Sequence, residues 1–205
     1  MKSYPSIPRS TGQDFQEFDA YVFDKLDGSN LRWEWARKGG WYKHGTRTRL
    51  FDETDEVFGS AIALFQKTLA EPLEKIARDE RWERMIVFTE FWGPRSLGGL
   101  HEPDDEKRLT LFDVNPHKKG ILGPQSFLKL FGHLDTPKFL GRMRWTRGFV
   151  EQVRRGEVEG ISDEGVVGKA GEGHKLVMAK AKTQTWIDKI LARYGEEQGR
   201  KIVES

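Results

Sequence analysis

The six residues Lys25–Asn30 (Lys-Leu-Asp-Gly-Ser-Asn) place a lysine beside a carboxylate and a glycine turn. A lysine amine is a nucleophile only when it is deprotonated, and burial or nearby positive charge lowers its pKa. Asp27 would raise that pKa if it lay close to the amine, so we expect it to accept a hydrogen bond or contact a metal. Gly28 allows the backbone to approach a ligand closely. Taken alone, the segment is better explained as a polar hairpin turn, because Asp-Gly is a common turn sequence.

Two lysines near the end of the chain, Lys180 and Lys182, form a second candidate group. Strand alternation puts residues i and i+2 on the same face of a sheet. Together the two ammonium groups could neutralise a phosphate and lower the pKa of a neighbouring lysine. The alternative is an exposed cationic strand edge that discourages aggregation. The apolar residues 176–179 that precede the pair favour a site.

The elements that must position these residues are short strands joined by turns, together with a few helices. The expected strands span residues 21–23, 31–36, 41–43, 85–91, 109–114, 165–169 and 175–181. The expected helices span residues 55–78, where Pro72 would kink or split the helix, 123–131, 146–155 and 183–194, with Thr146 as an N-cap. Residues 93–107 are expected to form an exposed loop. Because strands and helices are mixed without a βαβ rhythm, we predict an α+β fold with antiparallel sheets flanked by helices.

Composition limits the classes of function. The chain has 205 residues, of which 37% are hydrophobic and 32% charged, which is typical of a globular domain with a small appendage. We assign the domain to residues 1–182 and a C-terminal helix and tail to residues 183–205. Cysteine is absent, which excludes disulfides and thiolate chemistry and favours a reducing cytoplasm, the host's if the protein is viral. No apolar run approaches the roughly 20 residues that cross a bilayer, so no membrane partner is expected.

Charge gives only a weak indication of a nucleic-acid partner. The formal net charge is +2, and nucleic-acid binding depends on how lysine and arginine cluster. One cluster comprises Arg142, Arg144 and Arg147. An ordinary solvated surface explains this cluster equally well.

Six segments, in order along the chain, resemble the motifs of the covalent nucleotidyltransferases, the superfamily of polynucleotide ligases and mRNA capping enzymes. Lys25–Gly28 resembles the nucleophile motif of that superfamily. The other matching segments are Thr46–Arg49, Phe88–Gly93, Leu109–Val114, Glu164–Val167 and Lys180–Lys182. Any one of them could occur by chance, whereas six in order over residues 25–182 are a specific signal.

Asn30 gives the resemblance a direction within the superfamily. DNA ligases and capping enzymes typically carry arginine at this position, whereas phage-type ATP-dependent RNA ligases often carry asparagine. The chain is therefore similar to that RNA ligase family, which implies a nucleotidyltransferase (ATP-grasp-like) domain. Only residues 183–205 follow Lys182, too few for the OB-fold domain of DNA ligases and capping enzymes, so no OB fold is expected. A basic surface such as the Arg142–Arg147 cluster, or a helper domain or protein, would then grip the polynucleotide.

The resemblance implies three successive displacements at phosphorus. Lys25 attacks the α-phosphate of ATP, AMP passes to a 5′-phosphate end of RNA or of a nicked duplex, and a 3′-hydroxyl closes the strand. Positioning and charge neutralisation should dominate such chemistry. Lys180 and Lys182 are the implied catalytic cations. The residues implied to bind the nucleotide are Asp27, Gly28, Asn30, Arg47, Glu90 (ribose), Phe112 (adenine), Lys180 and Lys182.

Asp113 and Glu164 are the implied ligands of Mg²⁺, with Mn²⁺ as an alternative, because oxygen donors suit hard cations. A buried Glu164 paired with a lysine, without a metal, is the competing interpretation. Arg49 shares the role of Arg47, because the sequence does not fix the register of this segment. We assign no role to His44 and His101.

Three other functions compete with the RNA ligase hypothesis. The first is a minimal ATP-dependent DNA ligase that seals duplex nicks. The second is a non-catalytic relative that binds nucleotide or RNA, which the intact set of Lys25, Glu90 and Glu164 argues against. The third is an RNA-end adenylyltransferase that stops after the second step.

Overall fold

The computed structural model describes residues 3–8 and 15–204. These residues form two compact units, each with its own sheet. Unit 1 takes its described residues from 1–4, 28–136 and 172–174, and unit 2 from 5–27, 137–171 and 175–205. Residues 1–182, assigned above to one domain, are thus shared between the two units. The chain passes from unit 2 to unit 1 between Asp27 and Gly28. This point lies within Lys25–Asn30, which we call the lysine segment.

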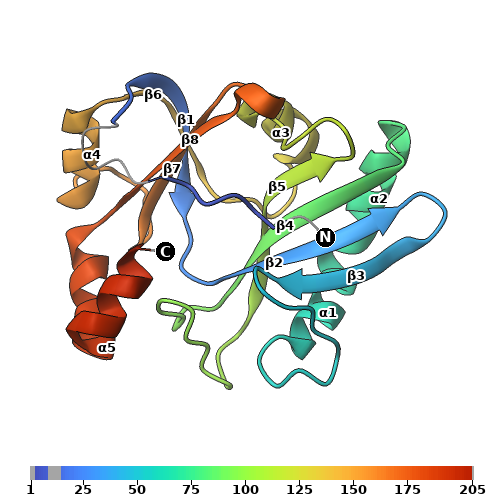
Figure 1. Ribbon diagram of the computed structural model, residues 1–205, viewed down its shortest axis with the longest axis horizontal. Helices are drawn as coiled ribbons and strands as arrows, with labels where there is room; N and C mark the ends of the chain where they lie inside the picture. Colours follow the sequence, from blue (N-terminus) through green and yellow to red (C-terminus); the bar gives the residue numbers. More distant parts are fainter. Residues whose placement is uncertain (1–2, 9–14, 205) are drawn as a thin grey trace. The chain divides into compact units, whose positions relative to one another are not determined.

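Unit 1 is built on a four-stranded antiparallel sheet with the order β3-β2-β4-β5 (Figure 1). Its strands are β2 (Ser29–Ala36), β3 (Gly40–Thr46), β4 (Arg84–Trp92) and β5 (Arg108–Pro116). The register between β4 and β5 shifts at Phe88 and Thr89, so that β5 carries an extra residue there. Such a bulge changes the direction of nearby side chains.

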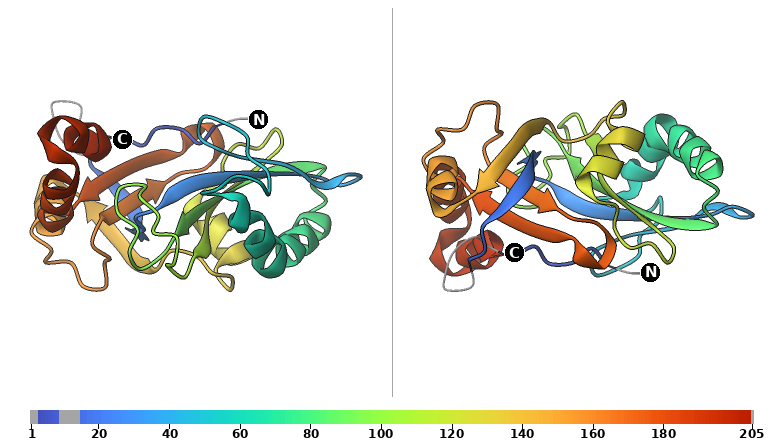
Figure 2. Two further views of the ribbon diagram at one scale, coloured as in Figure 1. Left: turned by 90° about the horizontal axis from the view of Figure 1, so that it is seen from below. Right: turned by 90° about the horizontal axis from the view of Figure 1, so that it is seen from above.

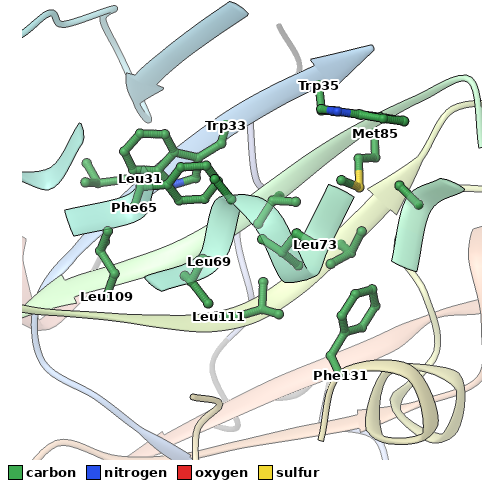
Figure 3. Packing of buried hydrophobic residues seen from close by; sticks show 14 of the residues in the cluster. Leu31, Trp33, Trp35, Phe65, Leu69, Leu73, Met85, Leu109, Leu111 and Phe131 are labelled. Atoms are coloured by element: carbon green, nitrogen blue, oxygen red, sulfur yellow. The ribbon is translucent and has the colours of Figure 1, made fainter. Parts of the chain in front are cut away.

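Helices cover one face of this sheet (Figure 2). They are α1 (Gly59–Phe65), the π-helical turn η1 (Gln66–Ala70), α2 (Glu71–Asp79) and α3 (Pro124–Phe131). In Figure 3 the rings of Trp33 and Phe65 lie against each other, with centroids 4.0 Å apart and planes at 6°. Leu69 and Leu73 extend this core, and both are almost fully buried. Because side chains alternate along a strand, Asn30, Arg32 and Glu34 lie on the opposite face of β2.

Unit 2 is a second antiparallel sheet, with the order β6-β1-β7-β8. The strands are β1 (Phe18–Lys25), β6 (Phe139–Trp145), β7 (Gly165–Ala170) and β8 (Val177–Lys182), and the 3-10 turn η2 (Gly173–Lys175) precedes β8. Helix α4 (Arg147–Arg154) packs Phe149 and Val153 against Trp145 and the inner strands. Helix α5 (Gln184–Glu204) is interrupted at Gly195, where φ is 75°.

Most of the predicted elements are present, and both sheets are antiparallel as predicted. Thr146 caps α4 by accepting a hydrogen bond from the Phe149 amide. The predicted helix over 55–78 is wrong in detail, because it begins at Gly59 and contains the π turn just before Pro72. Strand β6 was not predicted. No helix within the described residues is both long and apolar enough to cross a bilayer.

The Trp33–Phe65 contact generates a stability prediction. Phe65→Ala should lower the free energy of unfolding by about 3–5 kcal/mol, because it removes a buried ring and leaves a cavity. Val57, 46% exposed, supplies the control: Val57→Ala should change stability by less than about 0.5 kcal/mol. Urea unfolding followed by tryptophan fluorescence measures both. A loss below about 1 kcal/mol in Phe65→Ala would contradict this packing.

Candidate functional site

Lys25, Glu164 and Lys182 form a buried charge cluster in unit 2. Lys25 Nζ lies 2.7 Å from Glu164 Oε1, and Lys182 Nζ lies 3.3 Å from the same oxygen. The exposed fractions of the three side chains are 22%, 5% and 8%. The register explains the arrangement, because Gly165 of β7 is paired with Lys25 of β1 on one side and with Lys182 of β8 on the other. One carboxylate therefore meets two ammonium groups at the ends of three adjacent strands.

Lys180 lies on the same sheet face as this cluster. Val167 pairs with Phe23 on one side and with Lys180 on the other, two residues before the Lys25–Gly165–Lys182 row. Lys180 is only 5% exposed, and its backbone amide donates to the Pro8 carbonyl over 3.2 Å. The face thus carries Lys25, Lys180 and Lys182, together with Lys169. Alternation correctly predicted that Lys180 and Lys182 share a face.

Asp27 is engaged by the first turn of α5. Trp186 Nε1 donates to Asp27 Oδ2 over 2.6 Å, and Lys182 Nζ lies 4.3 Å from the centroid of the Trp186 ring. Thr183 caps this turn by accepting from the Trp186 amide, and its own amide donates to the Glu164 carbonyl. The aspartate therefore accepts a hydrogen bond, one of the two roles considered for it, and its partner Trp186 was not predicted.

Two motif glycines are required by close backbone contacts. A Cβ on Gly28 would overlap the Phe91 carbonyl oxygen and lie 2.7 Å from the Trp92 Cβ. Gly165 has φ of 138°, and a Cβ there would overlap the Ala181 carbonyl oxygen. Both therefore let neighbouring strands approach each other. At Gly28 the neighbouring strand is β4, and its approach to a ligand stays a prediction.

The last helical segment returns towards Lys182. After the interruption at Gly195, Gly199 lies close to Leu191 of the helical segment before the interruption. The Ile202 carbonyl then lies 3.5 Å from Lys182 Nζ. The C-terminal segment, expected as one helix with a tail, thus contributes a carbonyl to the lysine cluster.

Unit 1 carries the other predicted nucleotide-binding residues on the sheet face away from its helices. Asn30 pairs with Glu90 across β2 and β4, and Glu90 pairs with Thr110 of β5. Asp113 is paired with Phe88 in register. The bulge brings Phe112 to the same side, where its ring lies 6.3 Å from that of Phe88.

Tyr4 packs onto this face of unit 1. Its ring makes edge contacts with Phe88 and Phe112, with centroids 5.0 Å away in each case. The hydroxyl donates to Asp113 Oδ2. Burial and the neighbouring Asp113 carboxylate raise the pKa of Tyr4 well above its ordinary value, so the phenol remains a donor. No motif pointed to Tyr4.

Arg32 is a second unpredicted residue on this face. It is 7% exposed, and burial lowers its pKa, although a guanidinium remains charged. Its Nη1 donates to Ser3 Oγ over 2.8 Å, and Ser3 Oγ donates to the Arg47 carbonyl. In the sequence, only the alternation of charged residues with Leu31, Trp33 and Trp35 indicated that Arg32 lies on this face.

The two arginines of the Thr46–Arg49 segment differ in their surroundings. Arg47 is exposed, and its positive charge partly offsets the rise in the pKa of Tyr4. Arg49 forms an ion pair with Asp55, and its guanidinium carbon lies 5.7 Å from the Phe58 ring centroid.

His101, to which no role was assigned, contacts the lysine segment. Its Nε2 lies 2.8 Å from Ser29 Oγ, and its Nδ1 lies 3.4 Å from Ser96 Oγ. Burial, reinforced by the charge of Lys107, lowers its pKa to about 4. The imidazole is therefore neutral near pH 7 and positions Ser29 within unit 1.

The structure thus divides the predicted site residues between two sets. Unit 2 brings together Lys25, Asp27, Glu164, Lys180 and Lys182. Unit 1 brings together Gly28, Asn30, Arg47, Glu90, Phe112 and Asp113. Each set occupies one sheet and its ends.

The donor groups suit a Mg²⁺ ion that arrives with a nucleotide. No group of three or more potential metal ligands occurs in the described parts of the chain. Mg²⁺ commonly uses one or two protein carboxylates, substrate phosphates and several waters. Glu164 and Asp113 each offer one carboxylate, so they fit that pattern rather than a protein-only cage.

Several solved structures similar to this chain are RNA ligases. An archaeal ATP-dependent RNA ligase aligns in form 1 with a TM-score of 0.66 and 17% identity, over 99% of this chain and 56% of its own. In form 2 the TM-score is 0.64 with 15% identity, over 94% and 51%. The chain has the fold of these ligases. A Naegleria gruberi RNA ligase with AMP and Mn aligns at 0.61 and 14% identity, over 83% and 51%.

The chain spans about half the length of these RNA ligases. No family model and no curated protein matches the sequence. The likeness is therefore one of fold.

The Lys25–Glu164–Lys182 cluster predicts a large stability difference between two adjacent carboxylates. Glu164→Ala should cost about 3–5 kcal/mol, because two largely buried ammonium groups lose the carboxylate that they share. Asp163→Ala should cost at most about 1 kcal/mol, since Asp163 is 65% exposed and pairs with the half-exposed Lys189. Equilibrium urea unfolding measures both, and equal small losses would contradict the cluster.

The low pKa of His101 predicts a pH dependence. As pH falls through about 6.5 the unfolded chain gains a proton at this residue, whereas the folded protein gains it only near pH 4. Stability from His101 is therefore complete above about pH 6.5 and is lost between pH 6.5 and 4. NMR titration should give a midpoint near 4. His101→Asn should lack this part of the pH dependence, and a midpoint near 6.5 would show that the imidazole is not buried as described.

Proposed function

We propose that this chain is an ATP-dependent RNA ligase in which Lys25 carries the covalent AMP intermediate. The observation that supports this most directly is Glu164, buried between Lys25 and Lys182 on a fold shared with RNA ligases. Burying a carboxylate and two lysines costs desolvation free energy. The pairing of β1, β7 and β8 nevertheless brings these three groups together. The six ordered motifs supply the reaction class.

In the first step Lys25 Nζ attacks the α-phosphorus of ATP. A P–N bond forms, the bond to the bridging oxygen breaks, and pyrophosphate leaves. Lys25 must first lose a proton, and Glu164 Oε1, 2.7 Å away, is in position to accept it. Lys180 and Lys182 neutralise the charge that accumulates on the phosphoryl oxygens.

The second and third steps reuse the same phosphorus chemistry. A 5′-phosphate oxygen of RNA attacks the α-phosphorus, the P–N bond breaks, and Lys25 recovers its amine. The 3′-hydroxyl of the other strand then attacks the 5′-phosphorus and expels AMP. Each step is a displacement, so the protein contributes chiefly position and positive charge.

The residues of unit 1 are proposed to hold the nucleoside. Glu90 accepts hydrogen bonds from the ribose hydroxyls, and the Phe112 ring offers a π-face to adenine. Asn30 and the exposed Arg47 supply donors to phosphate, as do the backbone amides near Gly28 and Asp27. Tyr4 holds the Asp113 carboxylate through a hydrogen bond.

A Mg²⁺ or Mn²⁺ ion is proposed to enter with ATP, and Asp113 in unit 1 and Glu164 in unit 2 are the candidate carboxylates for binding it. Its contribution would be to neutralise phosphate charge. The Naegleria gruberi ligase was solved with ATP and Mn, which supports a nucleotide–metal pair in this fold.

The grip on RNA forms a separate part of the proposal. The similar ligases are about twice as long as the part that aligns with this chain. We propose that a further domain or a helper protein assists this chain in holding RNA ends or a nicked duplex.

Covalent labelling tests the nucleophile. With α-labelled ATP and Mg²⁺, wild-type protein should retain label after denaturing electrophoresis, because the phosphoramidate is covalent. Lys25→Ala should lose the label, whereas Lys189→Ala should keep it, since Lys189 is a half-exposed lysine paired with Asp163.

The outcome of that assay decides the enzyme class. A wild-type protein that takes no label from ATP, GTP or NAD would sink the ligase proposal and favour a binding relative. If label is present, matched nicked duplexes with an RNA or a DNA strand separate RNA ligase from DNA ligase. Accumulation of adenylylated RNA ends without sealing would identify the adenylyltransferase alternative.

A further inference from the structure

An aromatic and cationic patch lies on edge strand β6 and its neighbour β1. We name Tyr21, Phe139 and Arg142 the β6-edge patch. The rings of Tyr21 and Phe139 are stacked, with centroids 5.8 Å apart and planes at 29°. The guanidinium carbon of Arg142 lies 5.3 Å from the Tyr21 ring centroid, and the two residues are directly paired in register. Phe23, which is buried and paired with Phe139 in register, lies beside the patch, with its ring centroid 5.4 Å from that of Phe139.

The patch exposes both apolar and charged groups to solvent. Phe139 is 39% exposed, Tyr21 is partly exposed and Arg142 is exposed. Asp19 of β1 and Glu17, which precedes that strand, pair with Arg144, at 3.4 and 3.7 Å. Within residues 3–8 and 15–204, Arg142 takes part in a cation–π contact and in no ion pair. An aromatic surface with an uncompensated cation is complementary to a nucleobase attached to a phosphate.

We propose that the β6-edge patch binds unpaired nucleotides of the RNA strand that the enzyme joins. Stacking on exposed rings requires a base that is not already paired, and an arginine beside those rings meets the backbone phosphate. This inference rests on the proposed function for the identity of the polynucleotide. It adds a substrate preference to that function, namely a single-stranded segment next to the reacting end.

The position of the patch on β1 supports this assignment. Tyr21 and Lys25 lie on the same face of one strand, four residues apart, which corresponds to about 13 Å. The regular register of β1 with β7 preserves that alternation along the whole segment. The patch and the nucleophile are thus held at a fixed separation by one strand, as a binding site close to a reacting end requires.

Fluorescence anisotropy with a labelled, 5′-phosphorylated oligoribonucleotide tests the proposal at several salt concentrations between about 50 and 200 mM. Phe139→Leu keeps apolar bulk without a π-face and should weaken binding about tenfold with an unchanged salt slope. Phe139→Trp keeps a π-face and should therefore bind the oligoribonucleotide about as tightly as wild type, in contrast to Phe139→Leu. Arg142→Ala should reduce the slope of log K against log salt by about 0.7, the value of one phosphate contact on a single strand.

Arg200→Ala is the matched control, because Arg200 is a 72%-exposed cation of unit 2 paired with Glu196, and it should bind RNA like wild type. Circular dichroism checks that each variant is folded. Equal RNA affinity and salt slope in wild type, Phe139→Leu and Arg142→Ala would overturn the inference, as would a blunt RNA duplex that binds more tightly than the single strand. Failure of the ligase proposal is distinct, because it appears as absence of Lys25 labelling in wild type.

Discussion

The Glu164 carboxylate, held between two ammonium groups, is the interaction on which unit 2 depends. A charge in the protein interior is tolerated only when it is paired and hydrogen-bonded. Lys25 and Lys182 provide the pairing because β1 and β8 flank β7 in register at Gly165. A slip of one residue in either strand would turn a lysine to the other face and leave the carboxylate with a single partner. The sheet register therefore determines whether both lysines can reach the Glu164 carboxylate.

The same constraint explains the residues around the cluster. A side chain at Gly165 would separate β7 from β8, and the buried carboxylate would lose Lys182. The indole of Trp186 lies against Lys182 and donates to Asp27, so the first turn of α5 is tied both to the end of β8 and to the lysine segment. In unit 1 the corresponding device is Tyr4, whose hydroxyl and ring edge fix Asp113 and Phe112.

The sequence predicted those strands, helices and candidate site residues that depend on local periodicity or on a motif. The alternation of residues 31–36 and the apolar helix faces predicted most strands and helices, and strand alternation predicted that Lys180 and Lys182 share a sheet face. Strand β6 escaped prediction because Gly141 and two arginines interrupt its apolar residues, and its partner β1 lies more than a hundred residues earlier. Tyr4, Arg32, His101 and Trp186 escaped because each acts through a tertiary contact. A single histidine or tryptophan carries no spacing that would indicate its partner.

Strand alternation joins these observations into one scheme. One face of each sheet is apolar and holds helices, so the opposite face can carry polar groups without loss of the core. On β1 this produces Ala20 and Val22 against the core, and Tyr21, Phe23 and Lys25 on the chemical face. A stiff strand then sets the spacing between the ring proposed to bind RNA and the proposed nucleophile more reliably than a loop would, because neither side chain can move along the strand without breaking the ladder. Binding of a strand at the patch would accordingly restrict how far its end can lie from Lys25, which favours displacement at phosphorus through position alone.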